Sequence, residues 1–151
     1  MEFEVNDCFD LLLSACKAED IPLKTRYKQV RDLLERICRE QMQNESLQMT
    51  DLSARINYVA VKVGLNHIEQ NRLHTFRITS NKILNRQEEA TQEHLLRDVK
   101  TLAFFIRKVY QTDIPNELYG LLPRTDATYI VKAPGKQVTK RMRVCYQYMD
   151  D

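Results

Sequence analysis

Three polar residues spaced four apart, Arg77, Asn81 and Asn85, are the part of this sequence whose types and spacing could do chemistry. In an α-helix each step of four advances the position by only about 40°, so the three side chains share one ridge. A guanidinium can bind a phosphate or carboxylate at two points, and the two amides can both donate and accept hydrogen bonds. Because buried polar groups need partners, such a ridge either binds something or holds another helix in register.

His74 lies one turn before Arg77, and a helical wheel places it within about 60° of Arg77 and Asn81. An imidazole can take or give a proton near neutral pH, so His74 could act as a general base beside the guanidinium. The alternative is a surface histidine next to a structural arginine that pairs with a carboxylate of a neighbouring helix, such as Glu35 or Glu93. No histidine stands at metal-ligand spacing from cysteines or carboxylates, and no glycine-rich phosphate loop is present, so neither a metal nor a cofactor is expected.

The composition is that of one helical domain. The chain has 151 residues, of which 43% are hydrophobic and 29% charged, enough to bury a single core. Only three glycines and four prolines occur, which favours an all-α fold over a many-stranded sheet. A net charge of +2 is small for a dedicated nucleic-acid binder. The four cysteines form no C-x2-C pair and are expected to be reduced, and no signal peptide or apolar run of about 20 residues occurs, so we expect a cytoplasmic protein without a membrane partner.

Apolar residues at steps of three and four predict the elements that position the ridge. Helices are expected at about residues 3–18, 23–42, 52–63, 66–84 and 91–111, with a short one after Pro115. Asp51 or Thr50 can cap the third helix, Gly64 can end it, and Asn66 with a glutamate three residues on resembles a capping box. The pattern predicts an up-and-down bundle of four to five helices over residues 1–123.

Residues 124–151 differ in character and are predicted to form a separate extension. They are rich in strand formers and contain a Pro-Gly turn signal, which favours a β-hairpin or an extended arm. Cations interleaved with tyrosines could hold phosphates and stack bases of RNA or DNA; the candidate residues are Lys132, Lys136, Lys140, Arg141, Arg143 and Tyr146. The alternatives are a solvated basic arm or the opening strand of a following domain. The last residues carry no helix stop, so we expect the N-terminal piece of a longer protein.

Four segments, at residues 31–38, 52–56, 74–85 and 105–110, carry a family resemblance that extends over about residues 20–122. The pattern resembles the HEPN superfamily, and within it an uncharacterised bacterial branch found alone or fused to helicase and restriction-type motor subunits. The signature of that branch is an Arg, an Asn and a His at steps of four. Arg77 and Asn81 match this signature, and Asn85 stands where the family has histidine.

The resemblance implies a helical bundle whose signature residues line a groove between two paired domains. It also implies metal-independent ribonuclease chemistry in members that keep the histidine, because an asparagine amide cannot transfer the proton. With Asn85 at that position, we expect a noncatalytic interaction or regulatory module with Arg77, Asn81 and Asn85 at its interface. We expect it at the front of a larger helicase or restriction-type motor, and a homodimer is implied. The alternatives are a ribonuclease that uses Arg77 with His74, and an RNA- or DNA-binding module that uses the basic arm.

Overall fold

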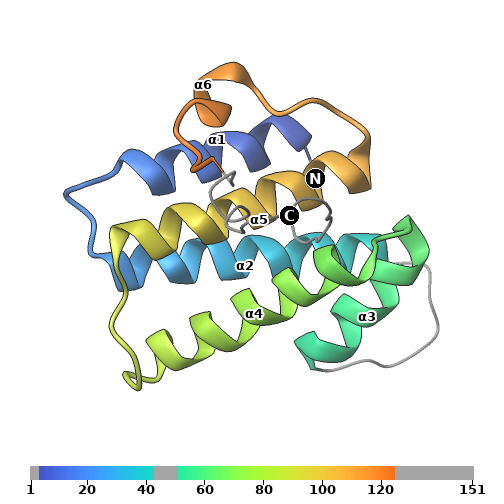
Figure 1. The fold of residues 1–151 in the computed structure, drawn as a ribbon, viewed down its shortest axis with the longest axis horizontal. Helices are drawn as coiled ribbons and strands as arrows, with labels where there is room; N and C mark the ends of the chain where they lie inside the picture. The colour runs from blue at the N-terminus through green and yellow to red at the C-terminus, as the bar shows by residue number, and fades with distance from the viewer. Residues whose placement is uncertain (1–3, 43–50, 125–151) are drawn as a thin grey trace, which may run out of the picture.

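A computed structural model of the protein describes residues 4–42 and 51–124 (Figure 1). These two ranges contain six helices: α1 (Val5–Lys17), α2 (Leu23–Gln41), α3 (Leu52–Val63), α4 (His67–Leu84), α5 (Gln92–Tyr110) and α6 (Asn116–Tyr119). The predicted boundaries agree with these to within about two residues at each end, which is the ordinary spread between assignments. The predicted hairpin or arm at 124–151 lies outside the described residues, apart from Arg124.

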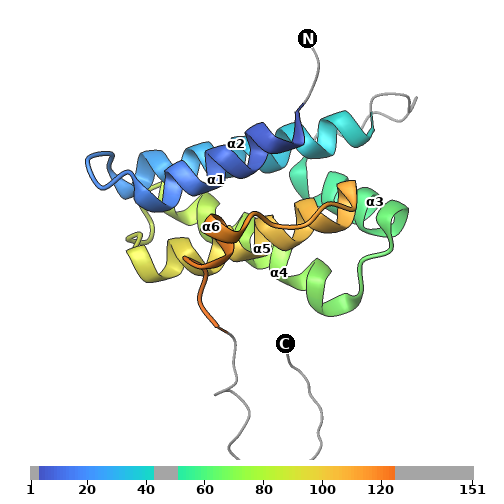
Figure 2. The same cartoon turned by 90° about the horizontal axis from the view of Figure 1, so that it is seen from above.

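The four long helices form an up-and-down bundle, as the sequence predicted. In Figure 1, α1 and α4 run in one direction while α2 and α5 run in the other. Seen from above in Figure 2, α1 and α2 form one layer and α4 and α5 the other. Helix α2 packs on both α4 and α5, and the shorter α3 packs against α2 and α4 at one end. The ridge on α4 is therefore positioned by α2, which packs along one side of α4, and by α3, which packs near the N-terminal half of α4.

Short polar motifs set the ends of the helices around this site. The Asp51 side chain accepts from a backbone N–H three residues on and begins α3, and Gly64 ends α3 with a φ of 79°. Asn66 and Glu69 form a complete capping box at the start of α4, and the Thr91 hydroxyl caps α5. These caps satisfy backbone donors that a helix start leaves without a partner, so the beginning of each of these helices is fixed locally.

The core is apolar and continuous between the two layers. Its largest fully buried side chains come from all six helices, and they include Tyr27 and Phe76, whose rings are stacked with centroids 6.1 Å apart. Cys8, Cys16 and Cys38, called here the core cysteines, are buried with free thiols, as predicted for apolar helix positions. Burial raises the pKa of the Cys8 and Cys16 thiols to about 11 and that of Cys38 to about 12. None of the helices in the described ranges is long and apolar enough to cross a bilayer.

Helix α6 closes the bundle on the side of α1 (Figure 2). Leu118 is fully buried against the core, and Lys17 forms an exposed ion pair of 3.0 Å with Glu117. An exposed pair of this kind contributes little, so burial of Leu118 holds the short helix in place. The chain then continues past α5 through Pro123, whose carbonyl accepts a 2.7 Å hydrogen bond from Lys100 Nζ.

Candidate functional site

The predicted ridge lies on the surface of α4 and not between packed helices. Arg77 is half-buried, whereas Asn81 and Asn85 are exposed. Asn85 Nδ2 donates to Asn81 Oδ1 at 3.4 Å, so the two amides lie along the helix as the spacing predicts. Their remaining donors and acceptors face solvent, which leaves the ridge able to contact a partner.

His74 joins this ridge to α3 through a chain of hydrogen bonds. Its Nε2 lies 2.7 Å from Asn57 Oδ1, which also accepts a 2.7 Å bond from Gln70 Nε2. Its Nδ1 lies 3.2 Å from Arg77 Nε, which can only donate. The proton of the neutral ring therefore belongs on Nε2, where it is donated to Asn57, and Nδ1 accepts from Arg77. Both ring nitrogens have protein partners.

The electrostatics of His74 agree with this neutral form. Partial burial and the neighbouring Arg77 charge both lower the pKa of His74 below its usual value of 6.5. At neutral pH the lone pair that a general base would use is bound to the Arg77 Nε–H. Proton transfer by His74 would thus require the guanidinium to leave first. The arrangement orients the Arg77 guanidinium.

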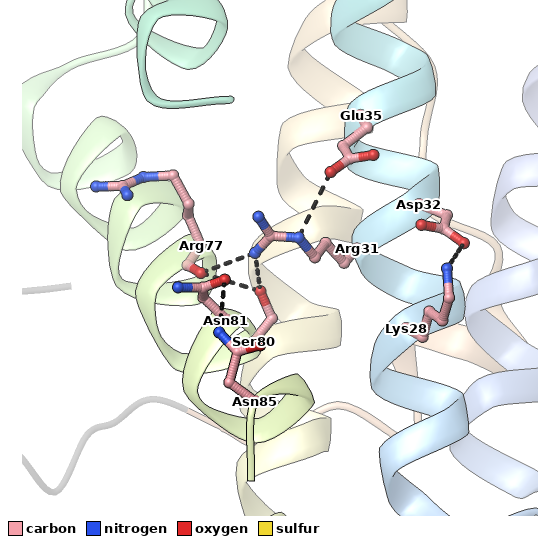
Figure 3. A network of polar contacts seen from close by, with 8 residues as sticks. All are labelled: Lys28, Arg31, Asp32, Glu35, Arg77, Ser80, Asn81 and Asn85. Carbon is pink, nitrogen blue, oxygen red and sulfur yellow. Dashed lines mark hydrogen bonds and ion pairs between the residues drawn. The ribbon is translucent and has the colours of Figure 1, made fainter. Parts of the chain in front are cut away.

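Behind the ridge, Arg31 of α2 holds the backbone of α4 (Figure 3). One terminal nitrogen of Arg31 donates to the Arg77 carbonyl at 2.9 Å and to Ser80 Oγ at 2.7 Å, and its Nε lies 3.5 Å from a carboxylate oxygen of Glu35. Ser80 is fully buried and also donates to the Arg77 carbonyl at 3.1 Å. Figure 3 shows the Arg77 guanidinium pointing away from α2 while its carbonyl faces Arg31. This network fixes the rotation of α4, and with it the direction of the ridge.

The alternative in which Arg77 pairs with Glu35 or Glu93 is wrong for this structure. Glu35 pairs with Arg31, and the hydrogen bond of the Arg77 side chain within the described residues goes to His74. The physical reason is the placement of Arg31, which lies between α2 and α4 and reaches Glu35 within its own helix at i+4. The terminal nitrogens of Arg77 accordingly point outward, on the side of α4 away from α2 (Figure 3).

A second polar cluster, which the sequence analysis missed, links α2 to α5. The fully buried Tyr27 hydroxyl donates to Asp98 Oδ2 at 2.6 Å, and Arg97 donates to both oxygens of the same carboxylate at 3.2 and 3.3 Å. Burial and the Asp98 carboxylate hold the pKa of Tyr27 far above its usual range, so the hydroxyl stays a donor. A signal was present: Asp98 stands three residues after Leu95 and four before Leu102, on the apolar stripe of α5, where a carboxylate needs a partner.

The remaining predicted site residues are not brought together by the described part of the chain. The basic and tyrosine candidates at positions 132, 136, 140, 141, 143 and 146 all lie in residues 125–151, outside the described ranges. Within residues 4–42 and 51–124, no group of three or more His, Cys, Asp or Glu side chains is placed to hold a metal ion.

The ridge presents polar groups on the surface of α4. Arg77 can bind an anionic group with its outward nitrogens, Asn81 and Asn85 can exchange amide hydrogen bonds, and His74 holds the guanidinium in position. No known family model, curated protein or solved structure matches this chain.

Proposed function

We propose that residues 1–123 form a noncatalytic HEPN-like interaction module, placed at the front of a larger nucleic-acid-processing protein such as a helicase or restriction-type motor. One observation carries the noncatalytic part of this proposal: both ring nitrogens of His74 are engaged, Nε2 with Asn57 and Nδ1 with Arg77. The position that holds histidine in the family signature is Asn85, whose amide cannot transfer a proton. The remaining signature groups are suited to binding.

The contact surface of this module is the α4 ridge, and its partner is a second copy of the same surface. Asn81 and Asn85 are exposed amides that each donate and accept, so they are complementary to themselves across a two-fold axis. Ile78 is 44% exposed and lies about 60° from Asn81 around α4, which adds apolar area beside the polar groups. Arg77, which His74 orients, adds guanidinium hydrogen-bond donors at the edge of this surface.

Sedimentation velocity and an RNA incubation test this proposal on the 151-residue chain. We expect the wild-type chain to self-associate, and Arg77→Glu to weaken self-association by about tenfold or more, because charge-assisted hydrogen bonds are lost. Arg107→Glu is the matched control, since Arg107 is an exposed cation of α5, a helix that carries no residue of the ridge. It should leave self-association close to that of the wild type.

In the incubation, single-stranded RNA in chelator should stay intact. Cleavage by the wild type that is lost in Arg77→Ala would overturn the noncatalytic proposal and support the ribonuclease alternative. Retention of RNA or DNA without cleavage, weakened by charge reversal at positions 140, 141 and 143, would support the nucleic-acid alternative. Equal self-association of the two glutamate variants would remove the ridge as the interface.

A further inference from the structure

A groove with a volume of about 560 Å³ lies between α4 and α5, separate from the ridge. The residues of α4 that line it lie between about 40° (Leu73) and 160° (Thr75) around the helix from Arg77, so the groove occupies a neighbouring flank of α4. Pro123 and Arg124 line it as well. Its volume falls within the range of about 300–1,000 Å³ that small-molecule sites occupy, which makes it large enough for a ligand of one or two rings.

The inner wall of the groove is apolar. Leu73 and Phe105 are buried side chains of the core that line it, and Leu65 and Phe104 are half-buried beside them. An organic body placed here would lose its contact with water on several sides and would contact aromatic and branched carbon surfaces. This part of the groove therefore selects for an apolar portion of a ligand.

The rim of the groove carries an excess of positive charge. Its cations are Arg72, Arg97, Lys100 and Arg124, and its carboxylates are Glu69, Glu93 and Asp98. Asp98 is 2% exposed and accepts two hydrogen bonds from Arg97, so its charge is directed into the protein. Glu69 accepts from the backbone of Asn66 in the capping box and lies 4.0 Å from Lys108. The charge of Arg97 is cancelled by Asp98 in the same pair, and the other three cations of the rim outnumber the other two carboxylates by one, which complements an anion.

Lys100 and Phe104 form a fixed part of this rim. Lys100 Nζ is held by the carbonyl of Pro123 at 2.7 Å and lies 6.0 Å from the centroid of the Phe104 ring. The guanidinium of Arg107 lies 5.7 Å from the same centroid. Cations held against an aromatic face keep their position at low entropic cost, so positive charge and apolar surface are presented together.

His94 places an imidazole side chain in the wall of the groove. Its Nδ1 is buried and has no hydrogen-bond partner within the described residues, and the side chain lines the groove. Its backbone N–H is already used, because it donates to Thr91 Oγ1 at 3.0 Å. Because Nδ1 has almost no exposed surface, a molecule in the groove would lie against the rest of the imidazole ring and would not bond to this atom.

We propose that the α4–α5 groove binds a small organic anion with an apolar body of one or two rings. The body packs on Leu73, Phe104 and Phe105 beside the His94 ring, and the acidic group faces the cations of the rim. The groove shares no residue with the ridge, so this ligand site and the proposed interface can be tested separately.

The test compares a charged probe with a neutral one on the 151-residue chain. 8-Anilinonaphthalene-1-sulfonate carries two ring systems and an anionic group, and N-phenyl-1-naphthylamine has the same rings without the charge. Direct excitation of the probes should show saturable binding of one sulfonate per chain, and binding of the neutral analogue weaker by about tenfold or more, because hydrogen bonds to charged groups are lost. Equal affinity for the two probes would overturn the anion part of the proposal.

Variants locate the binding in the groove. Thr101→Trp and Thr75→Trp fill it from α5 and α4, and both should reduce sulfonate binding by at least about tenfold. Thr25→Trp is the matched control, because Thr25 is an exposed helical threonine of α2 outside the groove, and it should bind as the wild type does. Binding that is the same in all three variants would place the probe elsewhere and overturn the proposal.

A measurement on the wild-type chain keeps the test independent of how the variants fold. Nitrogen chemical shifts of the imidazoles report hydrogen bonding at each ring atom. Saturating sulfonate should move the His94 ring resonances, because this side chain lines the groove, and leave those of exposed His67, which does not line it, in place. An unmoved His94 resonance at saturation would contradict the assignment of His94 to the site.

Discussion

Removal of the Tyr27 hydroxyl should destabilise the bundle measurably, and the structure sets the size of the effect. The hydroxyl donates to Asp98 Oδ2 at 2.6 Å, within the short range for a hydroxyl bound to a carboxylate. Hydrogen bonds to charged groups contribute about 1.5–3 kcal/mol. Because Asp98 keeps two hydrogen bonds from Arg97 after Tyr27→Phe, its charge is not left without partners. We therefore expect a loss near the lower end, about 1.5–2 kcal/mol in the free energy of unfolding.

Asp98→Ala should cost more than Tyr27→Phe. It leaves the buried Tyr27 hydroxyl without an acceptor, which adds a desolvation penalty of about 1–3 kcal/mol. Arg97 itself loses little, since its side chain is 49% exposed and can turn to water. In the double variant no orphaned hydroxyl remains, so its destabilisation should fall short of the sum of the two single variants by roughly 1–2 kcal/mol.

Urea unfolding followed by circular dichroism measures these differences. With an m-value of about 2 kcal/mol per molar, Tyr27→Phe should lower the unfolding midpoint by roughly 1 M. Tyr119→Phe is the matched control, because Tyr119 is 59% exposed, and it should stay within about 0.5 kcal/mol of the wild type. A Tyr27→Phe variant as stable as the control, or an additive double variant, would refute the reasoning that this hydrogen bond links α2 to α5.

Three further outcomes are expected. Folding lowers the pKa of His74 below 6.5, so the unfolded chain binds a proton at a higher pH than the folded chain does. The free energy of unfolding should therefore fall as pH decreases from about 7 toward the folded pKa. Urea midpoints measured across this pH range should vary less in His74→Gln than in the wild type. Gly64→Ala should lower the free energy of unfolding by about 1 kcal/mol, because residue 64 has a φ of 79°, and Arg86→Gly should raise it by about 0.5–1 kcal/mol, because residue 86 has a φ of 62°. Thermal unfolding should show a lower midpoint for the first variant and a higher midpoint for the second. The core cysteines, with the pKa of Cys38 raised to about 12, should resist alkylation until urea unfolds the chain, as read by peptide mass spectrometry.

Helix positions were predictable from the sequence because their signals are local. Asn66 with Glu69, Asp51 before an apolar run, and Gly64 after one each act within a few residues, and each cap forms as expected. The end of α4 shows where local reasoning stops. Arg86 takes the left-handed conformation that glycine usually supplies, and Gln87 N donates to Lys82 O at 2.8 Å, so the same type of stop forms without the residue that would reveal it.

The contacts of the candidate site were less predictable, because they join positions far apart in the sequence. The spacing placed Arg77, Asn81 and Asn85 on one ridge, but it could not show that Arg31, 46 residues before Arg77, would bind the carbonyl of that residue. An arginine on the polar side of one helix has several acceptors within reach, and only the packing of α2 on α4 selects among them. The same holds for the groove, whose walls come from α4, α5 and the segment after α6.

One polar network holds α4 against α2 and another holds α5 against α2, and this has a consequence for function. Arg31 and Ser80 fix the backbone behind the ridge, while Asp98 and Tyr27 fix α5, which forms the other wall of the groove. The two networks share no residue, and they meet through packed core side chains, such as Phe76 against Tyr27. A ligand in the groove can therefore affect an interface at the ridge only by shifting this packing. Loss of self-association on Arg77→Glu with sulfonate binding retained would show two independent sites on one helix, whereas loss of both would show that the core couples them.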